Sequence, residues 1–113
     1  MSLRIQRSEW FAGDLEHYAA WYDREASWEV AEEYLRAVAR TLTRLAETPD
    51  LGRPTYFSAG ELKELRCWPV ERPFQKHLIF YCHDETTLSA ERVVHGARDL
   101  PNRLIQPPGS ELE

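Results

Sequence analysis

Side chains that can bind an anion or move a proton gather in the second half of the chain. Residues 61–103 hold seven basic and seven acidic side chains, whereas residues 1–50 hold six basic and ten acidic ones. Arginines such as Arg66, Arg92 and Arg98 bind phosphate or carboxylate groups, and an imidazole such as His77 accepts a proton near neutral pH. The acidic overall balance therefore does not exclude an anion-binding site in this locally neutral half.

The histidines and cysteines do not have the spacing of a metal site. His77 and His83 are six residues apart on one expected strand, about 20 Å at the usual rise per residue, so they cannot share a metal ion. Cys67 and Cys82 follow no ligand spacing and are expected to be small, buried thiols. We therefore predict neither a metal nor another cofactor.

The length and composition predict one domain. The chain has 113 residues, is 42% hydrophobic and carries a net charge of −5, which counts against strong direct binding of nucleic acid. No apolar run approaches the roughly 20 residues of a membrane span, and the first residues lack the apolar stretch of a signal peptide. We expect a cytoplasmic protein with one domain over residues 1–106 and a disordered tail over residues 107–113.

The first half predicts a strand followed by two helices. Residues 3–7 alternate apolar and polar side chains, which is typical of a strand. Ser8 and Ser27 are suitable N-caps, and Thr48-Pro49 ends the second helix. Apolar residues at spacings of three and four line the two helices, namely Trp10, Phe11, Leu15, Tyr18, Ala19 and Tyr22, and then Ala31, Leu35, Val38, Leu42 and Leu45. Two helices joined by a short bend form an antiparallel hairpin.

The second half predicts a loop and three strands. Residues 49–60 contain prolines and glycines and read as a loop, and strands are expected over 62–68, 74–82 and 88–95, with a short helix over 98–105. The order β-α-α-β-β-β predicts an α+β fold in which the helical hairpin packs on one face of a small, mainly antiparallel sheet. The first strand is expected at the edge of that sheet. His77 and Tyr81 are expected to line the other, open face.

These residues and their order resemble the ParE/RelE superfamily of bacterial toxins, over about residues 3 to 104. The resemblance lies in Tyr18 to Tyr22, in residues 45–52 (LAETPDLG), and most densely in Leu65-Arg66, residues 73–81 (PFQKHLIFY) and residues 92–99 (RVVHGARD). It implies a RelE-like fold and a toxin of a type II toxin–antitoxin system that a cognate antitoxin keeps inactive. A ribbon-helix-helix antitoxin of the ParD-like kind is the expected partner.

Two activities occur in this superfamily: RelE-like members cut messenger RNA in the ribosome, and ParE-like members poison DNA gyrase. Cleavage through the 2′-hydroxyl needs a proton acceptor, a cation over the phosphate and a donor to the leaving oxygen. Arg66 and Arg98 match two arginines of the RelE-like nucleases, and Lys63 is the one lysine near their lysine positions. Leu104 stands near the place of their C-terminal Tyr or His, and a leucine cannot move a proton.

The incomplete nuclease set and the acidic charge favour the ParE-like branch, and thus a gyrase inhibitor that is not itself a nuclease. Two alternatives remain. The first is a ribosome-dependent endoribonuclease that uses Arg66, Arg98 and Lys63, with Tyr56 or His95 as a substitute proton carrier. The second is an inactive relative that only binds a partner.

The predicted contact surfaces divide between the two halves. The side chains expected to contact the target are Arg66, Lys76, His77, Arg92, Arg98 and Leu104. Trp21 and Trp28 of the hairpin and Tyr81 of the sheet are expected to contact the antitoxin, because exposed aromatic side chains anchor partners. The alternative role of the arginines is a structural ion pair, and that of the tryptophans is core packing.

Overall fold

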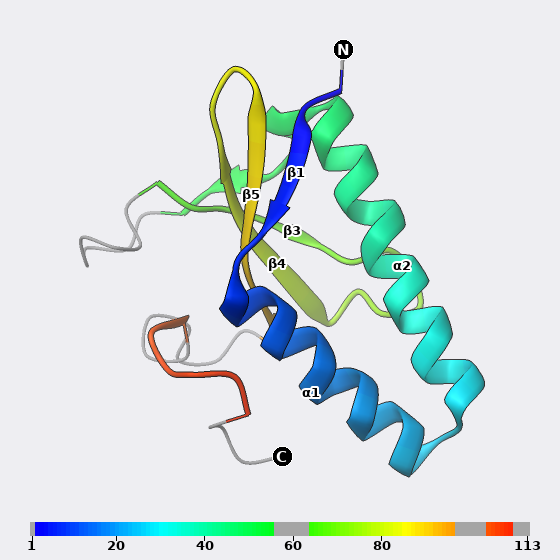
Figure 1. The fold of residues 1–113 in the computed structure, drawn as a ribbon. Helices are drawn as coiled ribbons and strands as arrows, with labels where there is room; N and C mark the ends of the chain where they lie inside the picture. The colour runs from blue at the N-terminus through cyan, green and yellow to red at the C-terminus, as the bar shows by residue number, and fades with distance from the viewer. Residues whose placement is uncertain (1, 56–63, 97–103, 110–113) are drawn as a thin grey trace.

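The computed structural model describes residues 2–55, 64–96 and 104–109. Its elements are β1 (Arg4–Arg7), α1 (Glu9–Glu25), α2 (Trp28–Glu47), the 3₁₀ turn η1 (Pro49–Leu51), β2 (Arg53–Pro54), β3 (Arg66–Pro69), β4 (His77–His83) and β5 (Thr87–His95) (Figure 1). The predicted α+β class and element order are confirmed, with the two-residue strand β2 added inside the predicted loop. The predicted helix over 98–105 falls almost wholly outside the described residues.

Serine caps start both helices, as predicted. The Ser8 hydroxyl accepts a hydrogen bond from the Phe11 amide at 2.9 Å, and the Ser27 hydroxyl accepts one from the Val30 amide at 3.2 Å. Each bond satisfies one of the amides that a helix leaves unpaired at its first turn. The helix α2 ends at Glu47, because the residue before Pro49 is disfavoured in the helical region. The two helices form the predicted hairpin (Figure 1).

The core-facing stripe of α2 differs from the prediction at one position. Leu35 was expected to be buried, but it is 39% exposed, while its neighbour Tyr34 is fully buried. The Tyr34 ring packs against the Tyr22 and Phe74 rings, and its hydroxyl lies 3.3 Å from Nδ1 of His77. A tyrosine with an internal partner for its hydroxyl fills the core better than the spacing rule alone indicates.

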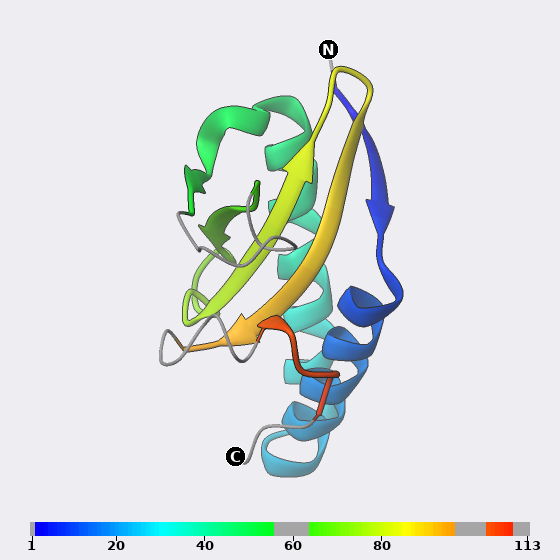
Figure 2. The same cartoon turned by 90° about the vertical axis from the view of Figure 1, so that its left-hand side faces the viewer.

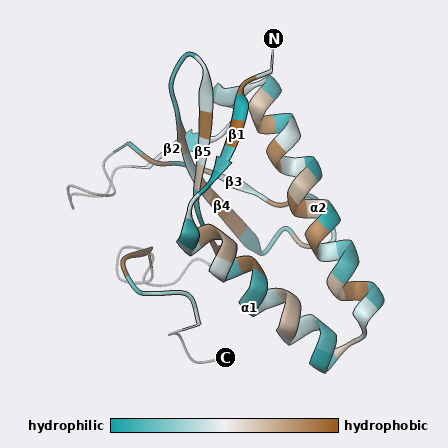
Figure 3. Cartoon of the chain, in the orientation of Figure 1, coloured by the Kyte–Doolittle hydropathy of each residue, from teal (hydrophilic) through white to brown (hydrophobic). Residues whose placement is uncertain are grey.

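The sheet has the order β1-β5-β4-β3-β2, with β1 parallel to β5 and the other pairs antiparallel. The first strand therefore lies at an edge, as predicted (Figure 2). The strand β4 lies in the middle of the sheet and carries strongly hydrophobic residues (Figure 3). A register shift between Phe80 and Tyr81 places Phe80 opposite Arg92 and Tyr81 opposite Ala90, so that Glu91 is the extra residue on β5.

The two faces of the sheet bury different clusters. The helix-covered face packs Ile79, Tyr81 and Val93 against α1 and α2, and the opposite face packs Phe80 and Val94 with Leu104 of the C-terminal segment, residues 104–109. The prediction that His77 and Tyr81 line an open face is therefore wrong. Alternation along β4 was predicted correctly, but the two faces were assigned the wrong way round.

The C-terminal segment also lies against α1. A Cβ atom built on Gly13 would come within 2.9 Å of the Pro108 ring, and one built on Gly109 would lie 3.4 Å from His17. None of the described helices is long and apolar enough to cross a membrane. Cys67 and Cys82 are free thiols.

Candidate functional site

Arg66, the arginine that matches the RelE-like nucleases, is held at the start of β3 by the loop before it. Its Nη1 donates hydrogen bonds to the backbone carbonyl of Gly52 at 2.7 Å and to that of Asp50 at 3.3 Å. Its Nη2 lies 3.4 Å from Oδ1 of Asp50, and the side chain is 27% exposed. The guanidinium thus fixes the η1 turn and presents only part of its surface to solvent.

Tyr81 holds the same turn from β4. Its hydroxyl donates to the Pro49 carbonyl at 2.7 Å and accepts from the Gly52 amide at 2.9 Å. A Cβ atom at Gly52 would lie 2.5 Å from the Tyr81 hydroxyl oxygen, so the close approach requires glycine there. Burial raises the pKa of Tyr81, which keeps the hydroxyl protonated as a donor. The predicted antitoxin contact at Tyr81 is wrong, because the side chain is fully buried.

His83 adds a group beside Arg66 that the sequence reasoning did not select. Its Nε2 lies 3.1 Å from Oδ1 of Asp50, the same oxygen that faces Arg66. The Asp50 side chain is 77% exposed and bridges the two. One signal could have found the cluster: Tyr81 pairs with Arg66 across the sheet, and His83 is two residues further along the same face of β4. A group that can move a proton therefore does lie beside the arginine.

His77 is buried among tyrosines. Its Nε2 lies 2.9 Å from the Tyr22 hydroxyl and its Nδ1 lies 3.3 Å from the Tyr34 hydroxyl, while the Tyr18 ring packs edge-on against it. Burial, with a smaller contribution from His95, lowers the pKa of His77 to about 3, so the ring stays neutral at neutral pH. The prediction of a target contact is wrong for this residue, because its side chain fills the core.

Arg92 is buried as well, in an ion pair with Asp14 of α1. Its Nε and Nη2 each lie 2.8 Å from one oxygen of the Asp14 carboxylate, which is a two-pronged geometry. Its Nη1 donates to the backbone carbonyls of Leu104 and Gln106 at 2.8 and 2.6 Å. The Cζ atom of Arg92 lies 5.0 Å from the centre of the Trp10 ring. The predicted target contact at Arg92 is wrong, because these partners leave its side chain almost without exposure.

Polar side chains at the start of α1 and within it form hydrogen bonds with the backbone of β5 beyond the end of β1. The strand β1 pairs with β5 only as far as Ala90. Beyond it the Ser8 hydroxyl donates to the Glu91 carbonyl, Asp14 accepts from the Val93 amide, and the Tyr18 hydroxyl accepts from the His95 amide. The distances are 2.8, 3.0 and 3.0 Å. Asp14 thus both pairs with Arg92 and covers an edge that would otherwise stay open.

The remaining predicted target residues divide into exposed, buried and undescribed positions. Lys76 is exposed. The Leu104 side chain is buried against Leu65, Cys67, Phe80 and Val94, which corrects its predicted surface contact, whereas the next residue, Ile105, is exposed. Lys63 and Arg98 lie outside the described residues, as does Tyr56.

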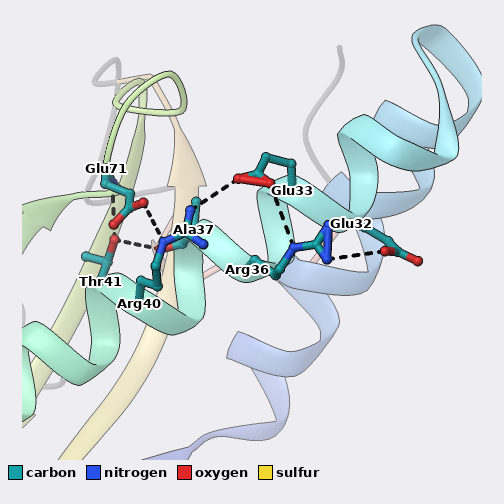
Figure 4. Close-up of polar contacts among 7 residues, drawn as sticks. All are labelled: Glu32, Glu33, Arg36, Ala37, Arg40, Thr41 and Glu71. Atoms are coloured by element: carbon teal, nitrogen blue, oxygen red, sulfur yellow. Dashed lines mark hydrogen bonds and ion pairs between the residues drawn. The ribbon is translucent and has the colours of Figure 1, made fainter.

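An exposed ladder of ion pairs runs along α2 and reaches the turn after β3 (Figure 4). The pair predicted between Glu32 and Arg36 is present at 3.5 Å, and Arg36 also lies 3.7 Å from Glu33. Arg40 lies 3.2 Å from Glu33 and 2.7 Å from Glu71, and its hydrogen bonds to them raise its pKa, that to Glu71 most. These side chains are half-exposed, which is typical of a solvated helix face.

The predicted antitoxin contacts on the hairpin differ in exposure. Trp28, at the start of α2, is 60% exposed, and Leu35 lies on the same side two turns later at 39%. Trp21 is half-buried, with its ring edge-on to Tyr22. Within residues 2–55, 64–96 and 104–109, no three His, Cys, Asp or Glu side chains come together in a way that could hold a metal ion.

Comparisons with known proteins agree on the fold. A chain from a solved structure of the chromosomal ParDE TA system from P. aeruginosa matches with a TM-score of 0.67 at 12% sequence identity, over 85% of this chain and 98% of that one. At that identity the likeness shows the fold alone. No curated protein matches. The family described as ParE toxin of type II toxin-antitoxin system, parDE, matches residues 5–100, which is most of the chain, and the chain therefore belongs to this toxin family.

Proposed function

We propose that the protein is a cytoplasmic toxin that inhibits DNA gyrase by binding it. The observation that carries the proposal is Leu104. RelE-like nucleases have a residue near this place that moves a proton, and here an apolar side chain is buried in a hydrophobic cluster. Arg66 supports the same conclusion, because backbone carbonyls of the η1 turn take up much of its hydrogen-bonding capacity. Membership in the ParE toxin family agrees with a binding toxin.

The proposed target contacts are Arg66 of β3, Lys76 just before β4 and Arg98 after β5. The Arg66 side chain is partly exposed and Lys76 is exposed, and Arg98 is proposed from its place in the sequence alone. The carbonyl of Lys76 accepts a hydrogen bond from the Gly96 amide at 2.8 Å, so the end of β5 lies beside Lys76. Cationic side chains here suit an acidic surface of a protein–DNA complex.

Gyrase-dependent cleavage of supercoiled plasmid tests the proposal. Purified protein is incubated with gyrase and plasmid, and the covalent complexes are trapped with detergent and protease. We expect linear DNA to accumulate with rising protein concentration, and to accumulate less with Lys76→Gln. The control is Arg36→Gln, which changes an exposed arginine of α2. Unchanged cleavage and supercoiling with the wild-type protein would contradict the proposal. Normal growth of cells that express it without antitoxin would favour the inactive relative.

The cluster of Asp50, Arg66 and His83 favours a second candidate, a ribosome-dependent endoribonuclease. The His83 imidazole could accept the proton of the 2′-hydroxyl, while Arg66 binds the phosphate. Toeprinting on translating ribosomes decides between the candidates. Cleaved messenger RNA that disappears with His83→Gln, but persists with His17→Gln, would support the nuclease and contradict gyrase as the target.

We also propose that a ribbon-helix-helix, ParD-like antitoxin lays an apolar segment over Trp28 and Leu35. The two side chains are among the most exposed large hydrophobic residues described, and a stable complex buries upwards of about 1,000 Å². Because residues 1–50 carry ten acidic and six basic side chains, the antitoxin segment should be more basic than is usual for such partners.

Calorimetric titration with the antitoxin tests this surface. Trp28→Ala and Leu35→Ala should each weaken binding by about tenfold or more, because buried aromatic and aliphatic anchors carry most of the affinity of an interface. Arg44→Ala, at another exposed position of α2, is the matched control. Wild-type affinity in both Trp28→Ala and Leu35→Ala would place the antitoxin elsewhere.

A further inference from the structure

One buried guanidinium connects three parts of the chain. Arg92 belongs to β5, its carboxylate partner Asp14 belongs to α1, and its two carbonyl partners belong to the C-terminal segment. Because Arg92 is paired with Phe80, its side chain leaves the sheet on the face where Leu104 packs. The guanidinium therefore lies between α1 and the C-terminal segment.

The donors of Arg92 are divided between these two partners. A guanidinium has five N–H groups in a fixed plane. Two of them point to the two oxygens of Asp14, and the two on Nη1 point to the carbonyls of Leu104 and Gln106. Asp14 thus sets the plane of the guanidinium, and the plane sets where the two carbonyls lie.

Stability alone does not explain this arrangement. Replacing a buried ion pair by an apolar pair of similar volume is often neutral or stabilising, because both charges lose their hydration on burial. An apolar pair, however, has no donor for the carbonyls of residues 104 and 106. The specific result of placing an arginine here is a fixed path for the C-terminal segment, with Leu104 turned into the core and Ile105 turned to solvent.

We propose that Arg92, oriented by Asp14, is a positioning residue that holds the C-terminal segment against the sheet, and that the segment held in this way forms part of the surface that contacts the target. The Trp10 ring lies over the same guanidinium and is 40% exposed, so we include it in the proposed surface together with Ile105. The second half of the proposal rests on the proposed function of the protein as a target-binding toxin; the first half does not.

Methyl NMR spectra of the full chain test whether Arg92 positions the C-terminal segment. Arg92→Lys keeps the positive charge, but a compact ammonium cannot reach both the carboxylate and the two carbonyls. We expect the Leu104 methyl signals to move towards random-coil positions, while those of Val38 and Leu42 in the helical layer stay in place. Leu104 signals that do not move would overturn the proposal.

A second variant covers the case in which Arg92→Lys does not fold. Asp14→Asn with Arg92→Met removes both charges and leaves an amide oxygen that can accept from the Val93 amide. The carbonyls of Leu104 and Gln106 then have no donor, and the Leu104 signals should again shift alone. If they keep their wild-type positions, the apolar contacts of Leu104 hold the segment and Arg92 does not.

Gyrase inhibition by the same variants tests whether the C-terminal segment contacts the target. The variant with a released segment should need about tenfold more protein for half-inhibition, whereas Arg40→Gln, in the exposed ladder, should match the wild type. Wild-type inhibition by a variant whose Leu104 signals have moved would overturn the role in target contact. If the wild-type protein inhibits no gyrase, the proposed function fails, and the NMR result still decides whether Arg92 positions the segment.

Discussion

Arg92 and Arg40 make the same kind of bond in two different surroundings. The Arg92 and Asp14 side chains are 5% and 4% exposed, and their ion pair has a separation of 2.8 Å. The Arg40 and Glu71 side chains are 51% and 41% exposed, and theirs has a separation of 2.7 Å (Figure 4). Nearly equal distances therefore do not mean equal energies, because water and salt screen the exposed pair and leave the buried pair unscreened.

The difference also concerns what each pair organises. Arg40 joins α2 to the turn after β3, which the core already holds in place through Val70 and Phe74. Arg92 joins α1 and β5 to a C-terminal segment that contributes Leu104 to the smaller cluster. A buried guanidinium is costly to leave unpaired and therefore specifies one arrangement, whereas an exposed one tolerates many.

The largest effect is expected from Arg92→Met. It leaves the Asp14 carboxylate buried without its cationic partner, which should cost about 3–5 kcal/mol of unfolding free energy. Urea denaturation followed by circular dichroism measures this loss. Adding Asp14→Asn removes the unpaired charge and should recover a large part of it. A loss below about 1 kcal/mol would mean that the buried pair behaves like the exposed one.

The pH dependence of stability sharpens the comparison, because His77 is a buried group that the fold keeps neutral. Its pKa is about 3 in the folded chain and 6.5 ordinarily. The unfolded chain therefore binds a proton first as the pH falls, and stability is lost between pH 6.5 and 3. From pH 7 to 5 the unfolding free energy should fall by about 2 kcal/mol because of this histidine. Denaturation curves of His77→Gln should lack this part of the dependence, and those of His17→Gln should keep it. Equal slopes in His77→Gln and the wild type would be contrary to the prediction.

The Arg66 side chain is 27% exposed, which lies between the exposures of Arg92 and Arg40. Its removal should therefore have an intermediate effect on stability. Arg66→Gln loses a charged hydrogen bond to the Gly52 carbonyl in a partly screened place, so we expect a loss of about 1–2 kcal/mol. Asp50→Asn is the control that keeps the carbonyl contacts of Arg66 and changes the exposed side-chain contacts of Asp50 with Arg66 and His83. If Asp50→Asn destabilises the protein as much as Arg66→Gln does, the ion pair and not the carbonyl contacts holds the η1 turn.

The smallest effect is expected from Arg40→Gln. Its partners are exposed and screened, so the melting temperature should change by no more than about 3 °C at low salt. The change should vanish in about 1 M sodium chloride. Differential scanning calorimetry at the two salt concentrations measures both. A large shift that persists in salt would remove the contrast between the ladder and the buried pair.

Local signals predicted the elements and the family. The caps at Ser8 and Ser27, the end of α2 at Pro49 and the three late strands follow from residue types and spacing. The pair between Glu32 and Arg36 follows from the helical repeat. Each of these features depends on residues that are close together in the sequence.

The site was predicted less well, because its contacts join residues far apart in the sequence. Asp14 and Arg92 are 78 positions apart. The extra residue Glu91 on β5 changes which face Arg92 occupies, and alternation alone does not show such a bulge. His77 and Tyr81 have polar atoms and were assigned to an open face, but tyrosine hydroxyls and backbone groups satisfy those atoms in the core.

Inhibition of gyrase supercoiling, titrated in parallel with three proteins, tests the central claim most directly. The proteins are the wild type, Arg40→Gln and the double variant Asp14→Asn with Arg92→Met. We expect the first two to inhibit at the same concentration and the third to need about tenfold more. No inhibition by the wild type would contradict the assignment of gyrase as the target, and equal inhibition by all three would contradict a role for the buried pair in target binding.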